Sequence, residues 1–207
     1  MGFYRRVVYP ALVSRLGNPQ PIQALREQIV PLARGDVLEI GVGSGVNFRY
    51  YDQANVERLY ALEPNAGMLR LAHAERRRTS LNIQFLTLPG ERIPLEDESV
   101  DTVVSTFTLC TIPALEQALH GIARVLKPDG LLIFLENSLA TDRRVQSWQR
   151  RWEPIHRRAF QGLLLTRDIP LLIGDAGFGI KHVDRLYLSR FPKSWTHCCW
   201  GTAGRDR

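Results

Sequence analysis

Between Val37 and Glu136 the sequence alternates short β-branched or apolar runs with longer segments of helical period. Parallel strands need long crossover connections, so this alternation predicts an open parallel sheet with helices on both faces. The predicted strands are Val37–Gly41, Arg58–Leu62, Asn82–Leu86, Val100–Ser105 and Leu131–Glu136. The predicted crossover helices, which carry apolar residues at helical spacing, are Ala66–Arg78 and Ala114–Leu126.

Two flanks do not continue the alternation. The 207 residues fit one domain, which we divide into an N-terminal helical lid (1–35), a core (36–136), a helical cover (137–180) and a C-terminal strand pair (181–207). In the cover we expect a helix from about Asp142 to Gly162, broken or kinked at Pro154, and a second helix N-capped by Thr166. The last two strands, Lys181–Leu188 and Ser194–Thr202, are predicted to pair antiparallel at the sheet edge.

Composition excludes several classes of protein. With 44% apolar and 23% charged residues, the chain is neither disordered nor collagen-like. Its three cysteines, two of them adjacent, suggest no disulfide framework and no zinc spacing, so we expect a reducing compartment and no metal. No apolar run approaches the roughly 20 residues of a membrane span, and no signal peptide is evident, so we expect a cytoplasmic protein.

The strand Val37–Ile40 runs into glycines at alternate positions, in the order Gly41-Val42-Gly43-Ser44-Gly45. Glycine allows unusual backbone dihedrals and lets a ligand lie against bare backbone, while a helix start after the loop would supply free N–H groups. The motif predicts a nucleotide-like cofactor. A tight turn without a ligand is the alternative.

The spacing of the glycines narrows the choice of nucleotide. A dinucleotide fingerprint needs its third glycine one position later, where this chain has Val46. This difference counts against NAD and FAD. Glu63 follows the second predicted strand, about 20 residues after the loop, where a carboxylate accepts hydrogen bonds from ribose hydroxyls. Alternatively, Glu63 caps the helix that Pro64 opens.

Four motifs occur in the same order as in a known family: the loop Glu39–Gly45, Glu63, the strand Ser99–Ser105 and the block Ala123–Gly130. Together they resemble the class I S-adenosylmethionine-dependent methyltransferases of type 11, a group that includes the ubiquinone-biosynthesis C-methyltransferases. The chain is most similar to the thiol S-methyltransferase-like branch, through the run Thr108-Leu109-Cys110 and a downstream signature. That signature comprises Trp152, Pro154, His156, Gly162, Leu165, Thr166 and Arg167.

The resemblance implies an α/β, Rossmann-like class I methyltransferase fold. Such a fold has a mostly parallel seven-stranded sheet, helices on both faces and an antiparallel strand near the C-terminus. It also implies S-adenosyl-L-methionine as cofactor and S-adenosyl-L-homocysteine as product. The residues expected to bind the cofactor are Glu39, Gly41, Gly43, Gly45, Glu63, Pro64, Gly90, Glu91 and Thr106.

Glu39 and Glu91 each have a structural alternative, as Glu63 does. Glu39 is expected to serve the methionine tail of the cofactor, or else to bond the glycine loop or an arginine. Gly90 is expected to donate its N–H to adenine. Glu91 either supports adenine from further away or has a surface role before a turn.

Methyl transfer needs aligned partners more than it needs an acid or a base, so no residue has to be strictly catalytic. A thiol with a pKa near ~8.5 already supplies some thiolate at neutral pH, which favours a thiol acceptor. A quinone, a phenol or a phospholipid stays open. The candidate acceptor-pocket residues are Thr106, Thr108, Cys110 and His156, in a pocket between the strand Val100–Ser105 and segments 1–17 and 142–167. Alternatively, Cys110 is a packed core residue and His156 an ordinary helix residue.

The net charge of +6 permits an anionic partner without requiring one. Arginine pairs recur every seven residues, at 143–144, 150–151 and 157–158. We expect them to form either a solvated helix face or a peripheral contact with a membrane. A nucleic-acid methyltransferase is the alternative enzyme. It lacks support, because the Asn/Asp-Pro-Pro-Tyr type of motif and a recognition module are missing, so we expect no nucleic acid partner. A cofactor-binding protein without turnover is the third class, and the oligomeric state is left open.

Overall fold

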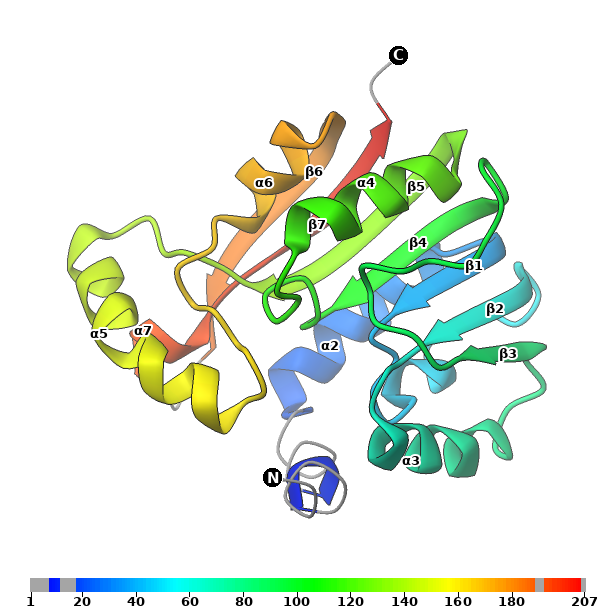
Figure 1. Ribbon diagram of the computed structural model, residues 1–207, viewed down its shortest axis with the longest axis horizontal. Helices are drawn as coiled ribbons and strands as arrows, with labels where there is room; N and C mark the ends of the chain where they lie inside the picture. Colours follow the sequence, from blue (N-terminus) through cyan, green and yellow to red (C-terminus); the bar gives the residue numbers. More distant parts are fainter. Residues whose placement is uncertain (1–7, 12–17, 189–191, 206–207) are drawn as a thin grey trace.

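The computed structural model describes residues 8–11, 18–188 and 192–205. It contains one seven-stranded sheet in the order β3-β2-β1-β4-β5-β7-β6 (Figure 1). The strands are β1 Gly35–Ile40, β2 Val56–Leu62, β3 Ile83–Leu86, β4 Val100–Thr106, β5 Leu126–Asn137, β6 Phe178–Tyr187 and β7 His197–Arg205. The strand β7 runs in the opposite direction to the other six and is antiparallel to both of its neighbours, β5 and β6. The predicted Rossmann-like methyltransferase fold is therefore confirmed.

Helices cover both faces of this sheet (Figure 1). The helices are α2 Gln20–Ile29, α3 Ala66–Arg76, α4 Leu115–Val125, α5 Arg143–Ala159, α6 Ile169–Asp175 and α7 Lys193–Thr196, with short 3-10 turns η2 Val30–Leu32 and η3 Val46–Arg49. One apolar layer joins the sheet to α4 and α6, through residues such as Leu119, Ile122 and Ile173. The other joins it to α2, η3 and α3, through Ile29, Phe48 and Ala72.

Local signals explain where these helices begin. The Asn65 side chain accepts hydrogen bonds from the N–H groups of Gly67 (2.8 Å) and Met68 (3.3 Å), and so it caps α3. Asp142 caps α5 in the same way, through the N–H groups of Arg144 (2.7 Å) and Val145 (3.3 Å).

Three details of the predicted C-terminal half are wrong. The helix expected from Thr166 begins at Ile169, because Asp168 is its N-cap and Pro170 fits its first turn. Thr166 instead donates two hydrogen bonds to the Glu153 carboxylate. The predicted strand Ser194–Thr202 starts as the short helix α7 after Pro192. The helix α5 continues through Pro154, so the predicted break is wrong, and the alternative of a kink there stays a prediction.

A fourth difference concerns the glycine loop. We expected an α-helix to start after Gly45, but the chain forms only the 3-10 turn η3 there. The left-handed backbone of Gly45 (φ 78°) and the inward-facing, fully buried Asn47 end regular structure at this point. A long helix N-terminus, the usual seat of a pyrophosphate, is therefore missing between β1 and β2.

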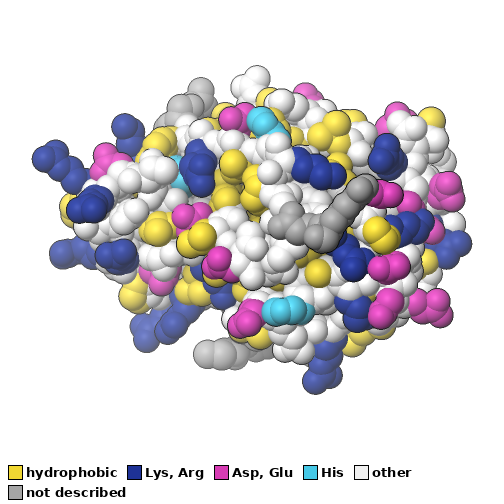
Figure 2. Space-filling model, turned by 90° about the horizontal axis from the view of Figure 1, so that it is seen from above, with side chains coloured by type: hydrophobic (Ala, Val, Ile, Leu, Met, Phe, Trp, Pro, Cys, Tyr) yellow, Lys and Arg dark blue, Asp and Glu magenta, His cyan; other side chains and the backbone are white. Residues whose placement is uncertain are grey.

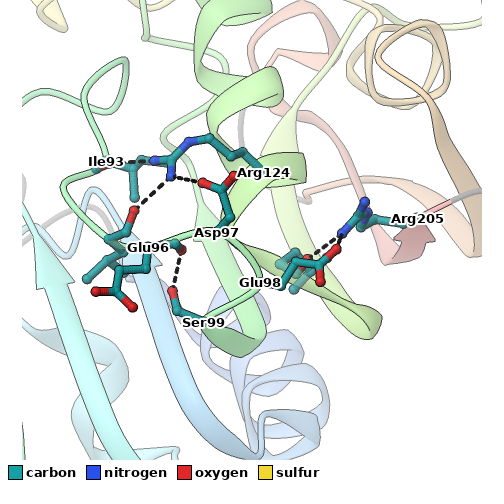
Figure 3. Close-up of polar contacts among 9 residues, drawn as sticks. Ile93, Glu96, Asp97, Glu98, Ser99, Arg124 and Arg205 are labelled. Atoms are coloured by element: carbon teal, nitrogen blue, oxygen red, sulfur yellow. Dashed lines mark hydrogen bonds and ion pairs between the residues drawn. The ribbon is translucent and has the colours of Figure 1, made fainter.

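The loop before β4 is fixed by two arginines (Figure 3). Arg124 on α4 donates to the carbonyl oxygens of Ile93 (2.9 Å) and Leu95 (2.8 Å) and pairs with Asp97 (2.6 Å). Arg205 at the end of β7 pairs with Glu98 at 2.7 Å. These contacts hold the amino end of β4, which is the opposite end of the strand from the one that carries Thr106.

The outward side of α5 is strongly basic. Its three arginine pairs are exposed, as are Trp148 (53%) and Ile155 (57%) between them. Figure 2 shows dark blue side chains gathered at the end of the molecule where α5 lies. The guanidinium of Arg151 lies 5.7 Å from the centre of the Trp148 ring. The solvated face predicted from the arginine spacing is present, and the membrane contact stays a prediction.

Candidate active site

The carboxyl ends of β1, β2 and β4 meet at one point of the sheet. Ile40 of β1 lies opposite Leu62 of β2 and Ser105 of β4, so the glycine loop, Glu63 and Thr106 emerge side by side. The strand order reverses here, because β2 and β3 extend to one side of β1 and β4 and β5 to the other. Open α/β sheets bind their ligands at such a switch point.

The three glycines of the loop all have left-handed backbone conformations, with φ between 58° and 78°. A Cβ on Gly41 would overlap the Thr108 side chain, and one on Gly45 would lie 2.6 Å from the Phe48 ring. At Gly43 the nearest atoms would be 3.8 Å away or more. Gly41 and Gly45 are therefore needed for packing, whereas a Cβ on Gly43 would make only ordinary van der Waals contacts. The backbone of Gly43 is half-buried and has no side chain that would keep a ligand away from it.

Glu63 lies directly beside the Gly43 backbone. Its carboxylate accepts hydrogen bonds from the N–H groups of Gly43 (3.0 Å) and Asn65 (2.8 Å). Burial raises the pKa of Glu63, and these two bonds oppose the rise. The alternative in which Glu63 caps the helix α3 is wrong, because the N-cap of that helix is Asn65. Each carboxylate oxygen keeps a lone pair for a further donor, such as a ribose hydroxyl.

Glu39 is almost completely buried under the loop (1% exposed). Its two oxygens accept hydrogen bonds from the Asn47 amide and the Tyr51 hydroxyl, both at 2.8 Å. Burial raises the pKa of Glu39 to about 7, although both hydrogen bonds and Arg26 act against this. Glu39 thus anchors the segment that follows the glycines, through partners other than the glycine loop or the arginine that its structural alternative named. A role toward the cofactor tail stays a prediction.

The side chain of Arg26 on α2 extends to Asn47 and Thr106 in the same buried cluster, and the sequence pattern did not predict this. The guanidinium is 4% exposed, and its Nη1 donates to Asn47 Oδ1 (2.5 Å) and to Thr106 Oγ1 (2.8 Å). One signal was available in the sequence. Ile22, Arg26 and Ile29 share one face of the helix, and an arginine on an otherwise apolar face needs a buried partner.

The loop after β4 is shaped by one buried carboxylate. Glu136 accepts hydrogen bonds from the Ser105 hydroxyl (2.7 Å) and from the N–H groups of Thr108, Leu109 and Cys110 (3.0–3.2 Å). Phe107 at the start of this loop has φ 55°, a costly value for a bulky side chain. Four hydrogen bonds to one carboxylate explain how the loop keeps that conformation.

The structure corrects one acceptor-pocket candidate. Cys110 has no exposed surface, so its side chain cannot line a space that an acceptor enters. Burial, together with the nearby Glu136, raises the pKa of the Cys110 thiol well above its usual value, which makes the thiol unreactive. Thr108 is half-buried and touches the loop of β1, since its hydroxyl donates to the Gly41 carbonyl at 3.4 Å.

The segment expected to hold adenine lies beside these loops. Gly90 is buried, and a Cβ there would lie 2.7 Å from Ile112. Glu91 accepts a long hydrogen bond (3.4 Å) from the N–H of Ala114 at the start of α4. Pro64 is exposed. The structure therefore brings Gly90 to the site, while the Glu91 carboxylate has a local partner of its own.

His156 belongs to an aromatic cluster between α5 and α7. Its ring stacks on Phe160 and meets the Trp195 ring edge-on, and Trp195 also contacts Trp152. His156 is 6% exposed, burial lowers its pKa, and its Nδ1 has no hydrogen-bond partner among the described residues. The chain after α5 is fixed to the β4 loop, where the N–H of Leu164 donates to the Cys110 carbonyl at 3.0 Å.

Two further expectations from the sequence concern a metal site and a membrane-spanning helix. Within residues 8–11, 18–188 and 192–205, no group of three or more His, Cys, Asp or Glu side chains is arranged to hold a metal ion. No helix in that part of the chain is long and apolar enough to cross a membrane. Most of segment 1–17, which forms one side of the predicted pocket, lies outside the described residues.

Comparisons with known proteins find related sequences. The profile of the family described as "Methyltransferase domain" matches residues 38–134. Human thiol S-methyltransferase TMT1A is 30% identical over 182 residues, which cover 83% of this chain and 70% of the relative. Human thiol S-methyltransferase TMT1B is 34% identical over 154 residues, which cover 72% of this chain and 62% of the relative.

Solved structures show the same fold at low sequence identity. The [4+2]-cyclase SpnF superposes with a TM-score of 0.73 at 17% identity, covering 98% of this chain and 93% of that chain. Its name states a reaction other than methyl transfer, so the shared fold alone does not determine the chemistry.

Proposed function

Because this chain belongs to the S-adenosylmethionine-dependent methyltransferases, we propose that it methylates a small apolar acceptor, with the sulfur atom of a thiol as the favoured acceptor atom. The observation that carries this proposal is the extent of the similarity to thiol S-methyltransferase TMT1A. The family profile ends at residue 134, whereas that similarity covers 83% of the chain. It therefore includes part of the C-terminal flank, where we predict the acceptor cover.

The residues at the switch point fit the cofactor. The half-buried backbone of Gly43 has no side chain to keep a ligand away, and the Glu63 carboxylate beside it has the lone pairs that ribose hydroxyls require. When bound, S-adenosylmethionine supplies a methyl group on a positively charged sulfur atom. We propose that Gly43 and Glu63 hold its nucleoside part and that Gly90 borders the adenine.

The reaction requires little acid or base catalysis from the protein. A thiol acceptor gives its proton to water, the thiolate sulfur forms a bond to the methyl carbon, and the bond from that carbon to the cofactor sulfur breaks, leaving its electron pair on the cofactor sulfur. The products are a thioether and S-adenosylhomocysteine. A thiol with a pKa near ~8.5 is partly ionised at neutral pH, so the protein mainly has to align the two partners and exclude water.

The aromatic cluster favours an apolar acceptor over a charged one. Its rings belong to α5 and α7, and the chain after α5 is fixed to the loop that follows β4. His156 is the polar member of the cluster. Because burial lowers its pKa, its imidazole is neutral at physiological pH, which suits an apolar surrounding.

The test is turnover with matched acceptors. The purified full chain is incubated with S-adenosylmethionine carrying a labelled methyl group, and with pairs of acceptors that differ only in sulfur or oxygen, such as thiophenol and phenol. We expect the label in the thioether, with one S-adenosylhomocysteine formed per product, and far less transfer to the oxygen partner. Glutathione tests for charged thiols, and the Glu63→Ala variant controls for contaminating activity.

Two results would count against the thiol assignment. One is transfer to a quinone or a phospholipid with none to any thiol. The other is binding of S-adenosylhomocysteine without transfer to any acceptor, which would favour the cofactor-binding protein without turnover. A rate that follows the thiol's own ionisation across a series of thiols would show that no protein base is needed.

A further inference from the structure

Arg26 is a buried cation whose hydrogen-bond partners are both uncharged. Nη1 donates to the amide oxygen of Asn47 and to the hydroxyl of Thr106. Nε is buried and has no partner among the described residues. The edge of the guanidinium formed by Nε and Nη2, the edge that grips a carboxylate with two parallel bonds, therefore has no hydrogen bond in the described part of the chain.

The charge of Arg26 is not balanced by direct contact with an acid. In the described ranges no carboxylate oxygen lies within ion-pair distance of this guanidinium. Glu39 is reached only through Asn47, which accepts from Arg26 and donates to Glu39. A buried charge without a close partner costs several kcal/mol, so a guanidinium retained here indicates an anion that binds beside it.

The position of Arg26 identifies that anion. Asn47 follows the glycine loop directly, Thr106 ends β4, and the Arg26 guanidinium carbon lies 5.6 Å from the centre of the Phe107 ring. The guanidinium is thus at the switch point, on the β4 side of the loop, whereas Glu63 is on the β2 side. The nucleoside of the cofactor has no negative charge, but its methionyl tail ends in a carboxylate.

We propose that Arg26 binds the carboxylate of the methionyl group of S-adenosylmethionine through its Nε–Nη2 edge, and that α2 is therefore part of the cofactor site. This inference rests on the proposed placement of the nucleoside at Gly43 and Glu63. Asn47 and Thr106 position the guanidinium from the other side. Ile22 and Ile29, buried on the same helix face, hold α2 against the sheet.

The experiment compares two ligands that differ only in the carboxylate. Binding of S-adenosylmethionine and of decarboxylated S-adenosylmethionine to the full chain is measured by calorimetry for the wild type, Arg26→Gln and Arg26→Lys. Arg49→Gln is the matched control, since Arg49 lies on η3 beside the same loop with its side chain 59% exposed. A hydrogen-bonded charge pair is worth about 10- to 100-fold in affinity.

For Arg26→Gln we expect S-adenosylmethionine to bind about 10- to 100-fold more weakly, while the decarboxylated ligand changes by less than about threefold. Arg26→Lys keeps a charge but loses the two-bond geometry, so we expect a smaller loss confined to the carboxylate-bearing ligand. Arg49→Gln should leave the ratio of the two affinities unchanged. If Arg26→Gln does not fold, the affinities of Arg26→Lys for the two ligands are compared in the same way.

Equal losses for both ligands would overturn the proposal and make Arg26 a support for the loop. A wild type that binds both ligands equally well would also overturn it. These results are distinct from a failure of the proposed site, in which Glu63→Ala would leave the affinity for both ligands intact.

Discussion

The buried carboxylate of Glu39 makes a sharp prediction about stability and pH. In the folded protein its pKa is about 7, because burial disfavours the charged form, and its usual value is 4.5. Between these two values the unfolded chain has lost the proton while the native state keeps it. Folding then takes up a proton, so the contribution of Glu39 to stability falls as the pH rises through this range.

The amide variant Glu39→Gln isolates this effect. A glutamine has nearly the same shape, its oxygen can accept from Asn47, and its NH₂ group can donate to a Tyr51 hydroxyl that has turned round. Glutamine does not titrate, so the pH-dependent part disappears. From pH 5.5 to 8.5 we expect the wild type to lose about 2 kcal/mol of unfolding free energy relative to the variant.

The assay is urea unfolding of both proteins at several pH values without cofactor. Glu57→Gln, an exposed change of acid to amide on β2, controls for the general loss of one negative charge. A constant difference between wild type and Glu39→Gln across the pH range would refute the reasoning. A difference that moves in the opposite direction would show that Arg26 and the two hydrogen bonds outweigh burial.

Three further predictions test other parts of the site. Glu136→Gln should lower the unfolding free energy by about 2–4 kcal/mol, because an NH₂ group would face a backbone N–H that needs an acceptor; an unchanged urea midpoint would contradict the loop assignment. Glu63→Ala should weaken S-adenosylhomocysteine binding by roughly 1.5–3 kcal/mol while the chain stays folded, and an unaltered dissociation constant would remove Glu63 from the cofactor site. Arg124→Met should cost about 1–2 kcal/mol of stability but leave that affinity intact, since its contacts lie at the other end of β4; weaker binding would disprove this independence.

The strands and the glycine loop could be predicted because their signals are local. β1, β2 and β4 follow apolar and β-branched runs, and the predicted bounds differ from the observed ones by no more than two residues. The short helix α7 was missed, since Ser194, Trp195 and Thr196 have strand-like composition. Only Pro192 before them indicated a helix start.

The parts of the site that were missed depend on contacts between distant segments. Arg26 and Thr106 are 80 positions apart, and no local pattern connects them. The carboxylate of Glu136 binds three successive backbone N–H groups, and such groups leave no trace in the residue types of the loop. The complete burial of Cys110 could not be read from the sequence, because it depends on how β5, β7 and the segment after α5 pack around the residue.

The insertion of β7 between β5 and β6 has a consequence for how the chain folds. β6 is synthesised first, but it pairs only with β7 in the finished sheet, so until β7 is made it has no strand beside it. The exposed charged residues Lys181, Asp184 and Arg185 protect β6 during this interval, because charge on an unpaired strand discourages association with other chains. β7 also closes the open edge of β5, the strand that carries Glu136. The order of synthesis therefore makes β7 the element that completes the sheet, and loop ordering around Glu136 should be a late event in folding.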